Sequence, residues 1–247
     1  MSIMAKKKAC VFCGNTNLSN EHIFAQWLLK ELGILEKDVT MTHAGFAGIP
    51  FSNRKHPFSK LVNGLVCEKC NNGWMSQLEE ECKHHIINLM NLKEFKEELK
   101  FLEEHHEKVA KWAFKNVILL NSATNYRQLV PAEHYISLYE GNIPAGVFID
   151  LAFCKKDITI EWRQTPGGLV IKNKSLPIRL AASRYTITFQ IKNLLMKVVF
   201  YDSEVNTLYE SKGVLRLYPQ FGVNGESDII YNDIDQFDLH GAMHEYI

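Results

Sequence analysis

The chain has 247 residues, with 28 Lys or Arg, 28 Asp or Glu, and 46% hydrophobic residues. This composition excludes an intrinsically disordered protein, and the length suggests one large domain or two small ones. The longest apolar runs, such as residues 117–120, are too short to span a membrane, and residues 1–8 lack the apolar core of a signal peptide. We therefore expect a cytoplasmic protein without a membrane partner, whose thiols stay reduced.

Two Cys-x-x-Cys pairs stand out in the first part of the chain: Cys10 with Cys13, and Cys67 with Cys70. A single pair of this kind is more often accidental or redox-active. Two pairs among only six cysteines indicate a zinc site, because two intervening residues let both sulfurs of a turn reach one metal ion. The sequence therefore predicts a structural Zn²⁺ bound by four thiolates.

Four other polar residues lie near these pairs in the sequence: Glu21, His22, Asn63 and Asn71. If zinc joins the two pairs, these side chains can converge on one small cleft. His22 could take a proton from water near neutral pH. Glu21 and Asn71 offer hard oxygen ligands for Mg²⁺ or Mn²⁺, and Asn63 could hydrogen-bond the imidazole. A base and one hard cation suffice to hydrolyse a phosphodiester.

These residues resemble the HNH nucleases, whose core is the ββα-metal fold. The resemblance is carried by Cys10-Val-Phe-Cys13, by Ser19-Asn-Glu-His-Ile23, and by the segment from Asn63 to Trp74. It is closest to the subgroup in which two zinc knuckles brace the hairpin and helix, and it covers roughly residues 8–75.

The resemblance implies a metal-dependent endonuclease that hydrolyses DNA. It makes His22 the general base, Glu21 and Asn71 the ligands of the catalytic cation, and Asn63 the support of the histidine, with Asn53 as the alternative for that support. A different class of function also fits: a catalytically inactive, zinc-stabilised module that binds nucleic acid or protein. In that case the Glu-His step is solvated surface, and Asn71 caps the following helix.

The charge is distributed unevenly although the net charge is zero. Residues 1–72 contain nine Lys or Arg and five Asp or Glu, a surplus of four positive charges. A basic patch beside a metal cleft suits a phosphate backbone, so we expect a nucleic-acid partner, with DNA preferred.

The remaining pattern predicts helices followed by strands. Apolar spacing predicts helices over residues 23–32, from Asn71 to residue 86, and over residues 95–113, whereas residues 39–60 read as an extended loop. Short β-branched and aromatic segments predict an antiparallel sheet or small barrel in the last part of the chain. The expected strands are residues 147–153, 158–162, 169–172, 178–182, 185–191, 195–201 and 214–218.

Several histidines and cysteines invite other assignments. The adjacent pairs at residues 84–85 and 105–106 cannot chelate well from a helix and are expected on an exposed polar face. His240 and His244 have helical ligand spacing but no acidic or cysteine partner nearby. Cys82 and Cys154 are expected to be buried core thiols.

Together these observations predict an α+β protein in three parts. Residues 1–75 form a zinc-braced ββα-metal module, residues 76–121 a helical connector, and residues 122–247 an antiparallel β-rich domain. The sequence leaves the role of the last part open, including homodimerisation through it.

Overall fold

The structure, a computed structural model, describes residues 8–44, 50–91, 95–123, 128–166, 169–172, 179–180, 185–201, 207–224 and 229–245. The chain divides into two compact units, residues 1–79 and 80–247. Helices and strands are mixed, which confirms the α+β class. None of the helices in the described ranges combines the length and apolar character needed to cross a membrane.

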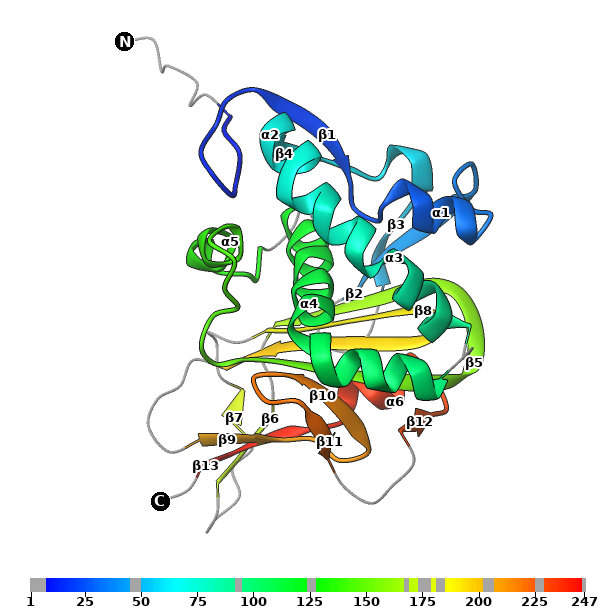
Figure 1. The fold of residues 1–247 in the computed structure, drawn as a ribbon, viewed down its shortest axis with the longest axis vertical. Helices are drawn as coiled ribbons and strands as arrows, with labels where there is room; N and C mark the ends of the chain where they lie inside the picture. Colours follow the sequence, from blue (N-terminus) through cyan, green and yellow to red (C-terminus); the bar gives the residue numbers. More distant parts are fainter. Residues whose placement is uncertain are drawn as a thin grey trace. The chain divides into compact units, whose positions relative to one another are not determined.

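The first unit contains a short antiparallel pair of strands, a hairpin and short helical segments (Figure 1). Its helix α1 begins later than predicted, because Ile23 and Phe24 form a bend and their side chains are buried. Leu28 and Leu29 are the buried residues of α1. The elements are β1 (Leu18–His22), α1 (Gln26–Glu31), β2 (Asp38–Ala44), β3 (Pro50–Pro57), η1 (Phe58–Lys60), β4 (Val62–Cys67), α2 (Glu68–Cys70), η2 (Asn71–Met75) and the start of α3 (Ser76–Met90).

The predicted loop over residues 39–60 is wrong. Strands β2 and β3 pair antiparallel from Asp38 opposite Pro57 to Ala44 opposite Pro50. The prolines that suggested a loop stand at the two ends of β3, where a missing amide hydrogen does least harm to the ladder. Asn53 lies in β3, and its side chain is outside the described part.

Two long strands, β5 (Val147–Pro166) and β8 (Tyr185–Phe200), form the centre of the second unit. Each joins two strands that the sequence predicted separately. The residues between these predicted strands are local irregularities and do not end the strands. In β5 the register shifts between Phe153 and Ile158, and in β8 Lys192 has a φ of 50°. The backbone resumes pairing after each irregularity, as at a β-bulge. The other strands of this sheet are β10 (Val214–Tyr218), β11 (Gly222–Asn224) and β12 (Ile230–Tyr231).

A second sheet has the order β7-β6-β13-β9. Its strands are β6 (Leu169–Lys172), β7 (Arg179–Leu180), β9 (Thr207–Glu210) and β13 (Ala242–Glu245). The expected antiparallel pairing holds for β5 with β8, but β12 pairs parallel with β5 and β13 pairs parallel with β6.

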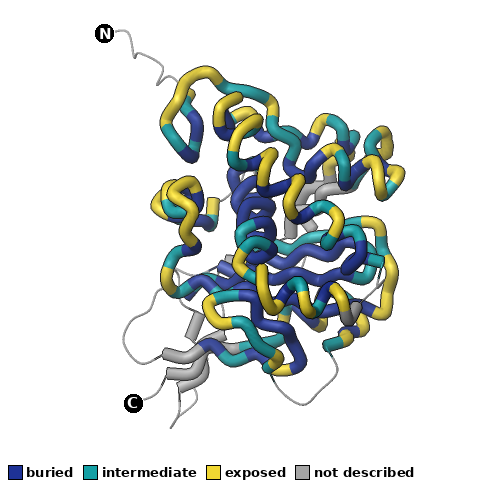
Figure 2. Tube along the Cα trace, viewed as in Figure 1, coloured by how far each residue is buried: buried dark blue, intermediate teal, exposed yellow. Residues whose placement is uncertain are grey.

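Helix α4 (Phe95–Ser122) packs against β5, β8 and β10, and its second half is buried on all sides (Figure 2). Trp112, Phe114 and Ile118 are buried there. The apolar run at residues 117–120 therefore belongs to a helix that is buried inside the protein. Two further helices, α5 (Ala132–Tyr139) and α6 (Ile234–Leu239), were not predicted; both are short, at eight and six residues.

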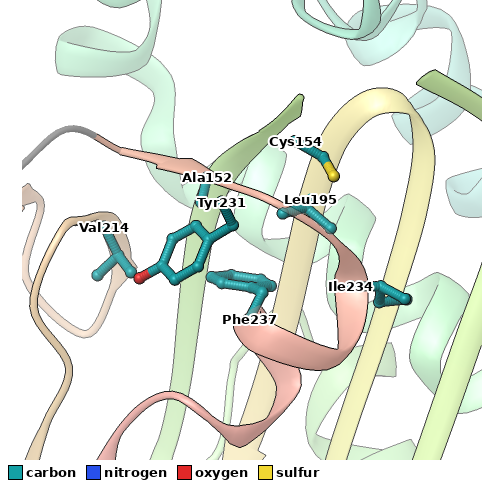
Figure 3. Packing of buried hydrophobic residues seen from close by; sticks show 7 residues of the cluster. All are labelled: Ala152, Cys154, Leu195, Val214, Tyr231, Ile234 and Phe237. Atoms are coloured by element: carbon teal, nitrogen blue, oxygen red, sulfur yellow. The ribbon is translucent and has the colours of Figure 1, made fainter. Parts of the chain in front are cut away.

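One buried cluster holds α6 against the large sheet. The rings of Tyr231 and Phe237 meet edge to face, with centroids 4.9 Å apart (Figure 3). Cys154 lies in this cluster and Cys82 is also buried, so the expected core thiols are confirmed. The cluster consists of Ala152, Cys154, Leu195, Val214, Tyr231, Ile234 and Phe237.

A row of buried charges crosses the same sheet. Asp150 stands opposite Lys197 on β8 and opposite Arg216 on β10. The Asp150 carboxylate pairs with Arg216 and accepts a hydrogen bond from Ser211 Oγ at 2.7 Å. Burial lowers the pKa of Lys197 to about 8, and its Nζ donates to the Phe237 carbonyl at 2.9 Å. These charges are paired or hydrogen-bonded, so the row serves to connect the strands and α6.

Candidate metal centre and adjoining site

Two elements of the first unit carry the predicted site residues. Strand β1 pairs antiparallel with β4, and Leu18 stands opposite Cys67. The second cysteine pair begins where β4 ends and α2 starts, and Cys67 occupies the cap position of that helix. The first pair approaches from a separate turn, whose Val11 amide donates to the Leu65 carbonyl at 2.9 Å. Backbone pairing therefore brings both cysteine pairs to the same end of the β1–β4 ribbon.

The four cysteine sulfurs lie within 4.8 Å of one another. Separate Sγ–Sγ distances are 3.4 Å for Cys13 to Cys67, 3.5 Å for Cys70 to Cys13, and 3.9 Å for Cys10 to Cys70. Four sulfurs bound tetrahedrally to zinc at about 2.3 Å are about 3.8 Å apart. The sulfurs are thus placed so that they could hold one zinc ion.

The electrostatics of the four thiols differ. Burial raises the pKa of Cys13 and of Cys70. Burial also acts to raise the pKa of Cys67, but hydrogen bonds from the Cys70 amide and from the neighbouring thiols lower it overall. Of these three thiols, Cys67 therefore loses its proton most readily, and a metal ion would displace the protons of Cys13 and Cys70.

Glu21 and His22 lie at the end of β1, and both are half-buried. Successive side chains of a strand point to opposite faces, so the carboxylate and the imidazole diverge. The Nδ1 atom of His22 is 3.5 Å from the Gln26 side-chain nitrogen. Across the ribbon, Glu21 stands opposite Asn63, and His22 stands opposite Val62.

Asn63 reaches this position through an irregularity in the ribbon. Ser19 stands opposite Val66, and a regular ladder from there would pair His22 with Asn63; the register instead shifts between Ser19 and Glu21. Asn63 is 2% exposed, and its Oδ1 accepts a hydrogen bond from the Leu65 amide at 2.9 Å. The structure thus brings Asn63 beside Glu21, the expected metal ligand, on the strand opposite.

Asn71 lies inside the helical segment, in η2. The helix starts earlier than predicted, with Cys67 as its cap residue, so the alternative that Asn71 caps the helix is wrong. Its side-chain nitrogen donates to Ser19 Oγ at 3.2 Å, and that hydroxyl donates to the Val66 carbonyl at 3.1 Å. The bond to Ser19 uses the nitrogen of Asn71, and the oxygen is the atom that a hard cation would bind.

The structure adds three residues that sequence reasoning did not single out. Ser19 links Asn71 to β4, and Gln26 lies near His22. Trp74 packs edge to face on Phe12 of the first cysteine turn, with ring centroids 5.3 Å apart. The sequence signal for Trp74 was its position four residues after Cys70, on the same side of a helix.

The other histidines are not brought together as metal ligands. Of the four histidines on α3 and α4, His84 and His105 are exposed as expected, whereas His85 and His106 are half-buried. His85 Nδ1 lies 2.9 Å from Glu98, and His106 Nδ1 donates to the Leu217 carbonyl at 2.8 Å. His240 follows α6 and His244 lies in β13, so their helical spacing is lost.

Metal sites of three or more His, Cys, Asp or Glu side chains need ligand atoms that lie close together. Among the residues that the structure describes, the four cysteines form such a group. The residues expected to bind a second, hard cation, Glu21 and Asn71, offer one carboxylate and one amide oxygen, of the chemical type that Mg²⁺ or Mn²⁺ accepts. No protein-family model, curated protein or solved structure matches this chain, so its function has to be argued from these side chains.

Proposed function

We propose that the chain is a metal-dependent endonuclease with a zinc-braced ββα-metal module and that its substrate is DNA. The observation that carries the proposal is the convergence of the four sulfurs at the end of the ribbon formed by β1 and β4. The same ribbon bears the Glu21-His22 step, and the helical segment after Cys70 bears Asn71. Two paired strands followed by a helical segment beside the four sulfurs support a module of the HNH type, here with α1, β2 and β3 between the two strands.

In this proposal, His22 acts on water. Its imidazole removes a proton while the water oxygen attacks phosphorus, and the bond from phosphorus to the leaving sugar oxygen breaks. Glu21 and Asn71 would hold one divalent cation, which when bound supplies neutralisation of the charge that develops on the phosphate and leaving oxygen. The divergence of Glu21 and His22 suits groups that act on opposite sides of one phosphorus atom.

The surplus of positive charge in residues 1–72 supports a polyanionic substrate. Three consecutive residues of β3, Arg54, Lys55 and His56, are exposed. Strand β3 ends at Pro57, and only a short segment separates it from Val62, which stands opposite His22. The hairpin therefore leaves the ribbon close to the proposed base, where cations can bind phosphates that flank the reacting one.

A second function, a zinc-stabilised nucleic-acid- or protein-binding module without catalysis, is favoured by one observation. Both asparagines already make structural hydrogen bonds: Asn63 accepts from the Leu65 amide and Asn71 donates to Ser19. A binding module needs no cation at Glu21 and no base at His22. The two functions therefore differ in what His22 does.

Nicking of supercoiled plasmid DNA with Mg²⁺ or Mn²⁺ distinguishes them. We expect the wild-type protein to nick the plasmid and His22→Ala to lower the rate by about 10²–10⁴, as the loss of a general base does. His105→Ala, which removes an exposed histidine of the second unit, is the control and should cleave like wild type. Zinc content should be equal in all three proteins. Plasmid binding without nicking by the wild type would favour the binding module.

A further inference from the structure

The indole of Trp74 lies against the metal centre. Trp74 lies in η2, four residues after Cys70, and the non-helical backbone of Gly73 (φ −96°, ψ −114°) directly precedes it. The ring of Phe12, which is buried between Cys10 and Cys13, meets the indole edge to face at 5.3 Å and 77°. Trp74 thus contacts one cysteine turn and belongs to the helical segment of the other.

The indole N–H of Trp74 is buried and makes no hydrogen bond of ordinary geometry within the described residues. A buried donor without an acceptor is costly, so such groups are rare in folded proteins. Trp27 in the same unit shows the usual outcome, because its Nε1 donates to the Glu79 carboxylate at 2.7 Å. The Trp74 indole acts to lower the pKa of the Cys70 thiol, against the burial that raises it, so the Cys70 sulfur is the nearby group that could accept this N–H.

We propose that Trp74 is a positioning residue of the metal centre, whose indole N–H donates a hydrogen bond to the Cys70 sulfur when that sulfur is a metal-bound thiolate. A thiolate has lost its own proton and carries negative charge, so it accepts an N–H more strongly than a thiol does. The bond would orient the Cys70 sulfur and keep the indole over the first cysteine turn. Donors that orient metal ligands in this way typically change metal affinity by about 10–100-fold when removed.

The proposal concerns the zinc site and does not depend on nuclease activity. Trp74→Phe removes the N–H and keeps an aromatic ring, and Phe12→Leu removes the ring that Trp74 packs against but keeps the N–H. We expect Trp74→Phe to release zinc to a colorimetric chelator about 10–100-fold faster than wild type. Phe12→Leu should release zinc at a rate closer to wild type.

Cobalt substitution gives a readout that packing alone does not move. A hydrogen bond stabilises the sulfur electrons, so its loss should shift the thiolate-to-cobalt charge-transfer band to lower energy in Trp74→Phe and leave it in place in Phe12→Leu. An unshifted band in Trp74→Phe, or equal shifts in both variants, overturns the proposal.

A measurement on the wild-type protein covers the case in which Trp74→Phe does not fold. In protein loaded with ¹¹³Cd, a hydrogen bond from the indole to a metal-bound sulfur should transmit a scalar coupling between the metal and the indole proton of Trp74. The chain has four tryptophans, so the coupling should appear on one of four indole resonances. Its absence from the Trp74 resonance overturns the proposal.

Discussion

His134 provides a prediction whose magnitude follows from the structure. This residue of α5 is 3% exposed, and its Nδ1 lies 3.1 Å from the Tyr185 hydroxyl. The Phe200 ring meets it edge to face at 4.5 Å, and Phe114 packs nearby at 6.0 Å. Burial lowers the pKa of His134 to about 4, although the Glu133 carboxylate acts in the opposite direction.

The direction of the pH effect follows from where the proton binds more tightly. An unfolded histidine has a pKa of about 6.5, so at pH values between about 4 and 6.5 the unfolded chain holds the proton and the folded chain does not. The contribution of His134 to stability is complete above about pH 6.5 and is lost as the pH falls toward 4. Lowering the pH from 7.5 to 5 should cost about 2 kcal/mol through this group.

The effect can be measured by native-state hydrogen exchange of the β8 amides, which reports on the second unit alone. We expect the opening free energy of wild type to fall between pH 7.5 and 5, and we expect His134→Gln to fall by about 2 kcal/mol less. Glutamine stays neutral and can still bond the Tyr185 hydroxyl. His105→Gln, at an exposed position, should behave like wild type. Equal pH dependence in wild type and His134→Gln would refute the reasoning.

Three further predictions concern the first unit. Chelation of the metal should remove amide protection from residues 8–79 and leave that of residues 80–247, because a structural zinc site supplies folding free energy to the unit that contains it; unchanged exchange after chelation contradicts this. Asn71→Ala should raise the Mg²⁺ concentration needed for half-maximal plasmid nicking, and an unaltered Mg²⁺ dependence argues against Asn71 as a ligand. Lys55→Glu should weaken DNA binding and reduce its salt dependence by about one counterion, measured with His22→Ala to prevent cleavage. Lys155→Glu, at an exposed strand position of the second unit, should bind like its parent, and equal loss in both variants would contradict a role for the hairpin.

The convergence of the four cysteines was predictable from the sequence because the chemistry of metal ligands restricts their spacing. Two cysteines separated by two residues suit one metal ion, and the fold needed only to bring two such pairs together. The backbone hydrogen bond from Val11 to Leu65 and the pairing of Leu18 with Cys67 achieve this. The spacing within each cysteine pair predicts a metal site, but the number of residues between the two pairs does not predict that they meet.

The long strands and the hairpin were harder to predict, for a different reason. Turn residues such as those around Lys192 were read as ends of strands, but the pairing between β5 and β8 continues beyond them. The pairing of the two long strands outweighs the local preference of these few residues for a turn. The short helices α5 and α6 have too few turns for a clear apolar period, and α5 depends on contacts with distant residues such as Tyr185.

The partner of Asn63 shows how one residue of register decides the chemistry of a site. In a regular ladder, the pairing of Leu18 with Cys67 and of Ser19 with Val66 would place Asn63 opposite His22, the histidine that it was expected to support. The shift before Glu21 places one more residue on β4 than on β1, which is the definition of a bulge. Asn63 stabilises that bulge by accepting a hydrogen bond from the Leu65 amide.

Deletion of Gly64 tests whether this bulge matters for function. Removing one residue from β4 should restore a regular ladder in which Asn63 still stands opposite Glu21. Asn63 and Leu65 then become adjacent, so the hydrogen bond from the Leu65 amide to Asn63 Oδ1 is lost and the Asn63 side chain is aimed differently. The cysteine end of the ribbon, where Leu18 pairs with Cys67, lies beyond the bulge and should keep its zinc. Gly64→Ala is the matched control, because a Cβ there would meet only Asn20 Oδ1, at 4.0 Å. We expect the deletion to retain zinc and lose plasmid nicking, and Gly64→Ala to retain both. Full nicking by the deletion variant would show that the bulge plays no part in catalysis, and loss of zinc would show that the two ends of the ribbon are coupled.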